Sequence, residues 1–196
     1  MSEKNAPDSA VTMTAEQFLL YLLEHRYTNI VLPEGLRVTQ WVRLPKVEFR
    51  GSFNCGNTVF VGLECGQARF RESFDCSQAT FESGFMFCCS AAVFEKDFLC
   101  SVATFRGSFD CSEATFQGGF SCGRAHFAES FQCNKSIFET SFSCGSALFD
   151  GDFNCSEADF KGRIYADSNP HIAWLIQQAK QGVIYGLDDV PPWLQP

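Results

Sequence analysis

Residues Phe94 to Phe160 read FEKDFLCSVAT FRGSFDCSEAT FQGGFSCGRAH FAESFQCNKSI FETSFSCGSAL FDGDFNCSEAD F, and one unit returns every eleven residues. If the first Phe of a unit is position 0, Phe recurs at positions 0 and 4, Cys at 6, and Ala or Ser at 9. A repeat this short and regular is typical of a solenoid, in which each repeat packs only on its neighbours. The repeat therefore predicts the architecture of the chain before any local feature is considered.

The spacing within the unit predicts short strands joined by corners. Side chains two residues apart lie on the same side of an extended backbone, so positions 4 and 6, and positions 9 and 0 of the next unit, are expected to point inward together. The gaps of four and three residues between these pairs predict corners. Two units then close one four-sided coil, and the chain is expected to be an all-β solenoid.

Two units have a different length, and both changes map to the same corner. The unit from Phe60 is one residue short and the unit from Phe81 is two residues long, yet the inward positions stay in phase if the change lies between positions 0 and 4. Length variation is typical of surface loops. The enlarged corner is residues 82–86. Four glycines occupy this corner in other units and are expected to ease its turn: Gly51, Gly107, Gly118 and Gly151.

The chain resembles the pentapeptide-repeat family, whose unit is a small residue, any residue, Leu or Phe, and two more. Four segments match it directly: Ala103-Thr-Phe105, Ala114-Thr-Phe116, Ala147-Leu-Phe149 and Ala158-Asp-Phe160. The alternate segments depart from the family, with Phe at the small position and Cys at the large one, as in Phe109-Asp-Cys111. The resemblance covers roughly residues 38–166 and implies a right-handed four-sided β-helix.

Short capping α-helices are expected at both ends of the solenoid. Thr14 and Gln17 form a capping-box pattern before an apolar segment from Ala15 to about His25. A solenoid end is a bare sheet edge, so this helix is interpreted as a lid, with a partner-docking helix as the alternative. The expected divisions are a flexible tail (1–13), a capping helix with a degenerate first half-coil (14–37), the solenoid (38–166) and a C-terminal helix and tail (167–196).

The C-terminal helix is predicted between Asn169, an N-cap, and Gly182, a C-terminal stop. Its simplest role is an end cap. The family resemblance implies a second role, since pentapeptide-repeat proteins often form homodimers through a C-terminal helix. Four residues are the candidates for that contact: Ile172, Trp174, Leu175 and Ile176.

The cysteines are predicted to be buried thiols rather than disulfides or metal ligands. Side chains stacked in a ladder point in parallel rather than at each other, and the sequence has no C-x-x-C pair for zinc. No metal or cofactor is expected. The eleventh cysteine, Cys88, is expected to face outward and reach solvent. Ten of the eleven share position 6: Cys55, Cys65, Cys76, Cys89, Cys100, Cys111, Cys122, Cys133, Cys144 and Cys155.

Composition narrows the functional classes. The chain has 196 residues, a net charge of −8 and 45% hydrophobic residues, which indicates one acidic domain. It has no apolar run of membrane-spanning length and no signal-peptide core, so a cytoplasmic protein without a membrane partner is expected. An acidic rod repels phosphate, which argues against direct nucleic-acid binding. The three histidines are scattered, with no paired nucleophile, so the protein is not expected to be an enzyme.

Three non-enzymatic roles remain at this point. The favoured one is a protein-binding scaffold that presents its outer walls and the enlarged corner, with Phe85, Met86 and Cys88 as the candidate contact residues; alternatively, Phe85 folds back over the adjacent wall. The family resemblance implies a DNA mimic that binds a type II topoisomerase such as DNA gyrase, although the outward residues at position 5 form no continuous acidic stripe. An ice-binding wall would need a regular outward Thr array, which is broken here.

Overall fold

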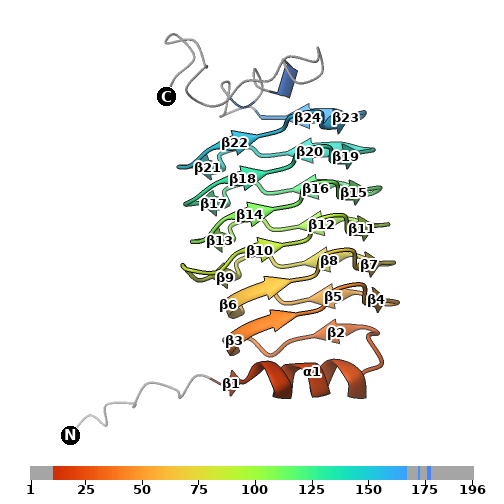
Figure 1. The fold of residues 1–196 in the computed structure, drawn as a ribbon, viewed down its shortest axis with the longest axis vertical. Coiled ribbons are helices and arrows are strands. Elements are labelled where there is room, and N and C mark those ends of the chain that lie inside the picture. Colours follow the sequence, from red (N-terminus) through yellow and green to blue (C-terminus); the bar gives the residue numbers. More distant parts are fainter. Residues whose placement is uncertain (1–10, 167–171, 173–175, 178–196) are drawn as a thin grey trace, which may run out of the picture.

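Short parallel strands, stacked one coil above the next, form a rod with the first strands at one end and the last coil at the other (Figure 1). This arrangement comes from a computed structural model, which describes residues 11–166, 172, 176 and 177 of the chain. The longest uninterrupted wall holds seven strands, so the rod has about seven turns. The predicted all-β solenoid is confirmed.

Four walls surround one axis, and each unit contributes to two of them. The first wall holds β9 (Thr80–Phe81), β13 (Thr104–Phe105), β17 (His126–Phe127) and β21 (Leu148–Phe149). The second holds β10 (Phe87–Cys88), β14 (Phe109–Asp110), β18 (Phe131–Gln132) and β22 (Phe153–Asn154). The third holds β4 (Glu48–Phe49), β7 (Arg69–Phe70), β11 (Val93–Phe94), β15 (Thr115–Phe116), β19 (Ile137–Phe138) and β23 (Asp159–Phe160).

The fourth wall runs the full length of the rod. It holds β2 (Ile30–Val31), β5 (Phe53–Asn54), β8 (Phe74–Asp75), β12 (Phe98–Leu99), β16 (Phe120–Ser121), β20 (Ser141–Ser143) and β24 (Arg163–Tyr165). Near the N-terminal end, the first and second walls merge because two longer strands run through the corner between them, so that they form one sheet. These strands are β3 (Arg37–Arg43) and β6 (Val59–Glu64), and β1 (Thr12–Met13) pairs with β3.

The register confirms that two units make one coil. Phe87 of β10 pairs with Phe109 of β14, and Phe98 of β12 pairs with Phe120 of β16, a separation of twenty-two residues in each case. Equal separations place equal positions of the repeat above one another. Each inward position of the unit therefore becomes a column that runs along the axis.

The phenylalanine columns form a herringbone lattice in the core. Phe105 stacks on Phe81 and on Phe127 with centroid distances of 4.9 Å and interplanar angles of 1°. Within its own unit it meets Phe109 edge to face, at 4.9 Å and 82°. Both geometries are favourable aromatic contacts, and each adds about 0.5–1.5 kcal/mol beyond the area that it buries. The interior is thus filled by rings, and the rod is held together along its axis by repeated contacts of the same kind.

The cysteine and alanine positions are joined by a tight turn. In the unit from Phe94, the backbone N–H of Ala103 donates to the carbonyl of Cys100 at 3.1 Å, and Val102 between them has φ 61°. This is the geometry of a type II turn, whose third residue needs positive φ. The same position is left-handed in eleven units: Lys46, Asn57, Gln67, Gln78, Ala91, Val102, Glu113, Arg124, Lys135, Ser146 and Glu157.

The glycines of the other corner have a different role from the one predicted. Gly35 and Gly84 are the described glycines with positive φ, so the corner glycines need no special conformation. A Cβ on Gly118 would instead lie 2.3 Å from the carbonyl carbon of Lys96 in the preceding coil, and one on Gly107 would lie 1.9 Å from the carbonyl oxygen of Phe85. The interpretation that these glycines ease the turn is wrong, because they let neighbouring coils approach closely.

Helix α1 (Ala15–Glu24) covers the first coil, as the lid interpretation predicts (Figure 1). Thr14 caps it, and the reciprocal bonds of the capping box to Gln17 are both present. Phe18 and Leu22 are fully buried, and the ring of Phe18 meets Phe60 edge to face at 5.7 Å. The helix therefore closes the apolar interior at the N-terminal end.

The C-terminal helix lies mostly outside the described residues. Ile172, Ile176 and Gln177 are helical, and both isoleucines are fully buried in the core cluster of this chain. Trp174 and Leu175 lie outside the described residues. Homodimerisation through this segment stays a prediction.

Candidate functional site

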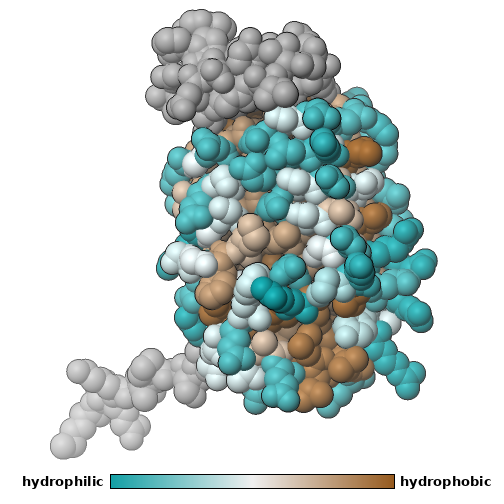
Figure 2. Space-filling model, viewed as in Figure 1, coloured by the Kyte–Doolittle hydropathy of each residue, from teal (hydrophilic) through white to brown (hydrophobic). Residues whose placement is uncertain are grey.

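The axis is filled with side chains, so a binding surface must lie on the outside of the rod. Figure 2 shows one face on which hydrophilic side chains dominate and hydrophobic ones gather toward the end covered by α1. Two of the candidate residues, Phe85 and Met86, are among the exposed large hydrophobic side chains, with 42% and 37% of their surface accessible. Their surroundings define the candidate site.

The first element of the site is the short unit, in which one corner is absent. The short unit from Phe60 contains no turn after position 0, and β6 continues straight from the first wall into the second. Gly62 in this strand pairs with Trp41 of β3, where the register shifts between Val38 and Trp41. Because one residue is missing here, the Trp41 side chain comes close to Gly62: a Cβ on this glycine would lie 3.1 Å from Cδ1 of Trp41.

The second element is the enlarged corner in the next coil, residues 82–86, which we call the Phe85 loop. Gly84 has φ 84°, and the chain then turns so that Phe85 lies over the shortened corner. A Cβ on Gly62 would lie 2.7 Å from the Cβ of Phe85, so only glycine fits beneath the loop. The extra residues of one coil thus fill the space left by the missing residue of the coil below. Phe85 covers the adjacent wall, and 42% of its surface still remains exposed.

Two ion pairs and a cation–π contact stabilise the Phe85 loop and the strands β3 and β6 beside it. Glu82, at the start of the loop, accepts from Arg37 of β3 with nitrogen–oxygen distances of 2.8 and 2.9 Å. The guanidinium of Arg43 lies 3.9 Å from the ring centroid of Trp41 and 3.2 Å from a carboxylate oxygen of Glu64. The ring of Trp41 also meets the ring of Phe85, with 5.6 Å between centroids. Trp41 therefore contacts both a cation and an aromatic ring.

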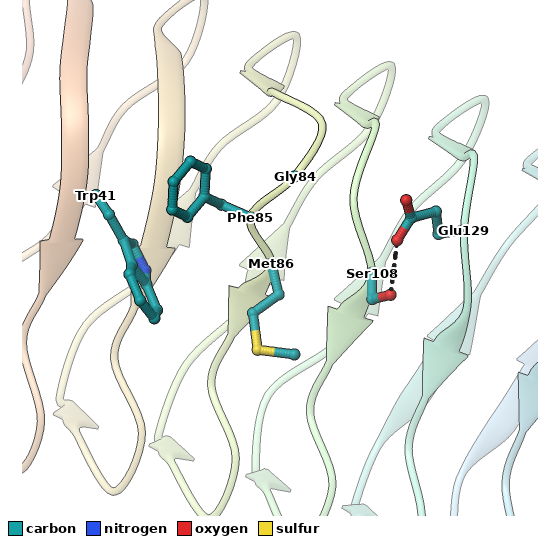
Figure 3. A pocket seen from close by; sticks show the side chains of 6 residues that line it. All are labelled: Trp41, Gly84, Phe85, Met86, Ser108 and Glu129. Carbon is teal, nitrogen blue, oxygen red and sulfur yellow. Dashed lines mark hydrogen bonds between the residues drawn. The ribbon is translucent and has the colours of Figure 1, made fainter.

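An open groove of about 430 Å³ lies beside the Phe85 loop, and we call it the Phe85 groove (Figure 3). Figure 3 shows its lining side chains in a row that follows successive coils. At the far side, the hydroxyl of Ser108 donates to Glu129 at 3.0 Å and accepts from Ser130 at 3.2 Å. The groove is apolar at one end and carboxylate-bearing at the other. Its lining residues are Trp41, Gly84, Phe85, Met86, Ser108 and Glu129.

Of the three predicted contact residues, the structure brings Phe85 and Met86 together, and Cys88 lies apart. Cys88 is half-buried on β10, its sulfur lies 3.3 Å from the hydroxyl of Ser90, and that hydroxyl donates to Asp110 at 2.8 Å. Cys88 does not line the groove. Sequence reasoning missed Trp41, Ser108 and Glu129. Trp41 carried a signal, since it is a large aromatic residue at a corner position where other units have small or polar ones.

The cysteine columns have no such surface role. All eleven cysteines lie in the described part of the chain and are in the thiol form, and the ten at position 6 are buried. Burial raises the pKa of Cys89, Cys100 and Cys111 well above the ordinary thiol value, and it raises that of Cys155 to about 12. A thiol that stays protonated at neutral pH is a poor nucleophile and a poor metal ligand. The columns therefore act as apolar packing.

The outward carboxylates at position 5 are partly used by the fold itself. Asp75 accepts the backbone N–H of Ser77 at 2.8 Å, and Asp110 accepts that of Ser112 at 2.9 Å. These carboxylates hold the start of the turn that follows each strand. They are thereby less available as an evenly spaced acidic stripe.

The third wall carries charges of both signs along its edge. Glu48 pairs with Arg71, and this hydrogen bond lowers the pKa of the Glu48 carboxyl. Lys161 donates to Glu139 at 2.9 Å, and that bond raises the pKa of the Lys161 ammonium. All four side chains are exposed, so water and salt screen these pairs. This edge is a mixed surface rather than a field of one sign.

Within the described residues, no group of three or more His, Cys, Asp or Glu side chains is placed to hold a metal ion. Over the same part of the chain, no helix is both long and apolar enough to cross a membrane. In comparisons with known proteins, no family model matches the chain, and no match was found among curated proteins or solved structures. The resemblance to pentapeptide repeats therefore stays a prediction from the residues.

Proposed function

We propose that this protein is a non-enzymatic scaffold that binds a protein partner through its outer walls and the Phe85 groove. The observation that carries the proposal is the exposed pair Phe85 and Met86 beside Trp41, on a rod that otherwise buries nearly all of its phenylalanine. Aromatic and methionine side chains are enriched at protein interfaces and supply many of the dominant contacts. A repeat solenoid is also a fold used mainly to present extended surfaces.

A loop-specific capture experiment tests this proposal. Tagged wild-type protein and the double variant Phe85→Ser/Met86→Ser are used to capture partners from a cell extract. Leu148→Ser is the matched control, because Leu148 is 59% exposed on β21 and does not line the groove. We expect a partner that the wild type and the control retain and the double variant loses. An identical set of captured proteins for all three would contradict the proposal.

A second function is supported by charge. The net charge of −8 on a rod suits a mimic of duplex DNA that binds DNA gyrase or another type II topoisomerase. The use of Asp75 and Asp110 in turns weighs against it. A supercoiling assay with titrated protein separates the two functions, because a DNA mimic inhibits gyrase and a scaffold does not. Full gyrase activity at micromolar protein would exclude the mimic.

Three further assignments belong to this proposal. We place the chain in the pentapeptide-repeat family on the repeat alone. We place the protein in the cytoplasm because eleven thiols persist most readily in a reducing compartment. Homodimerisation through the C-terminal helix is supported by the resemblance, and the oligomeric state measured by light scattering tests it.

A further inference from the structure

The Phe85 groove has a direction, because its lining residues come from successive coils. Phe85 and Met86 lie in the coil of β9 and β10, Ser108 in the next coil, and Glu129 in the one after that. Adjacent parallel strands are about 4.8 Å apart, so two coils separate Phe85 from Glu129 by about 10 Å along the axis. An occupant that contacts both ends must lie along the rod.

The two ends of the groove differ in chemistry. The N-terminal end offers the rings of Trp41 and Phe85 and the side chain of Met86. At the other end, Glu129 is the charged residue of the lining. Its carboxylate accepts from the hydroxyl of Ser108, and within the described part of the chain it forms no ion pair. A cation at this end would complement the groove and the net charge of −8.

The third feature is an indole without an acceptor. The Nε1–H of Trp41 is buried and has no hydrogen-bond partner among the described residues, which costs about 1–3 kcal/mol in a native protein. Figure 3 shows this nitrogen on the side of the ring that faces the Phe85 loop. A peptide backbone presents carbonyl acceptors along its whole length. An occupant's carbonyl reaches this buried N–H only if the Trp41 ring shifts, so the case for a peptide occupant rests on the apolar and charged ends of the groove.

We propose that the Phe85 groove takes an extended segment of the partner protein, with an apolar side chain over Trp41 and Phe85 and a lysine or arginine at Glu129. An extended chain rises about 3.3 Å per residue and its side chains alternate, so two side chains that both face the groove are two or four residues apart. This inference rests on the proposed function and adds the recognition chemistry of the same site.

Selection of displayed random peptides against the full-length protein tests the inference directly. Enriched sequences are expected to combine an apolar residue with a lysine or arginine two or four positions away. Binding of the enriched peptide is then measured by fluorescence anisotropy with Glu129→Lys, and we expect affinity to fall by about tenfold or more because like charges meet. Glu113→Lys is the control, since Glu113 is exposed, carries the same charge and does not line the groove.

Charge reversal separates this inference from the proposed function. A peptide whose basic residue is replaced by glutamate should recover its affinity for the Glu129→Lys protein, which a merely structural role of Glu129 would not produce. If enriched peptides lack a basic residue or bind Glu129→Lys normally, yet are lost with Phe85→Ser/Met86→Ser, the inference fails and the proposed function stands. Peptides indifferent to both variants would contradict both. If no sequence is enriched, the inference fails, and the capture experiment decides the proposed function alone.

Discussion

The cysteine side chains fall into two chemical classes, buried and partly exposed, and a shift of one position in the repeat separates them. At position 6 the sulfur points to the axis, and burial raises the pKa of thiols such as Cys55 and Cys76. Cys88 occupies the outward position 5 of its unit, next to a buried cysteine, and it is half-exposed. The thiolate is the reactive form of cysteine. The reactivity of each thiol should therefore depend on whether that residue is buried.

We predict that one thiol of the eleven reacts with Ellman's reagent in the native protein at about pH 8, and that all eleven react after unfolding in guanidinium. Cys88→Ser should abolish the native reaction and leave ten thiols after unfolding. Rapid reaction of several thiols without denaturant would show that the columns open to solvent.

The corner glycines make a second prediction about single residues. Gly118→Ala places a methyl group 2.3 Å from backbone of the preceding coil, whereas Gly145→Ala meets nothing within 4 Å. We expect Gly118→Ala to lower the free energy of unfolding by about 1–3 kcal/mol, since overpacking forces the backbone to shift. Gly145→Ala is the control and should be close to neutral. Urea denaturation measures both variants, and equal stabilities would refute the close-approach explanation.

The sequence predicted which side chains point inward, because a strand alternates and a repeat multiplies that signal over many units. It did not predict why glycine occupies the corner. That reason depends on the distance between Gly118 and the coil beneath it, which no local pattern contains. Trp41 was missed for a similar reason, since its contact with Phe85 joins residues forty-four positions apart.

The tight turns between Cys and Ala connect the strands of the solenoid, and the turn that contains Val102 is strained. Val102 has φ 61° and is 52% exposed, so its β-branched side chain gains little from packing. Left-handed backbone costs an L-residue about 1–2 kcal/mol, and asparagine tolerates it better. This turn is the element in which a surface substitution should stabilise the rod.

We predict that Val102→Asn raises the free energy of unfolding by about 1 kcal/mol. Ser101→Asn, one residue earlier in the same turn and not left-handed, is the control and should give no gain. Thermal and urea unfolding measure the difference. A destabilised Val102→Asn protein would show that the Val102 side chain packs more strongly than its exposure suggests.

The two irregular corners show how much of the candidate site could be predicted from the sequence. The sequence predicted that the units from Phe60 and Phe81 change length at a surface corner, and β6 and the Phe85 loop confirm it. It held a further signal: the two units are two repeats apart, so their corners stack. The short corner and the long corner were not combined into one site, because the contact between Phe85 and Gly62 arises only when the coils stack.

The molecule as a whole should be sensitive to alkali. Burial raises the pKa of eight thiols above their ordinary value near 9.0, namely Cys55, Cys65, Cys76, Cys89, Cys100, Cys111, Cys133 and Cys155. In the unfolded chain these thiols ionise as the pH rises through that value, while the folded chain keeps them protonated. The unfolded state then binds fewer protons, and stability falls as pH rises.

We predict that the free energy of unfolding is steady below about pH 8 and falls steeply above about pH 9, by about 1.4 kcal/mol per pH unit for each such thiol. Urea denaturation across this pH range under reducing conditions measures the slope. Cys111→Ala should lower stability at neutral pH but make the slope above pH 9 shallower, which separates ionisation from packing. A flat profile would mean that the thiols ionise without unfolding.

A rod assembled from identical coils looks the same at every step along its length, so a partner that read only the repeat would bind at any height. The skipped corner at Gly62 and the Phe85 loop above it break that translational symmetry at one level. Loss of one residue and gain of two in vertically adjacent units therefore mark one height along the solenoid, and a partner of the proposed kind would bind at that height alone.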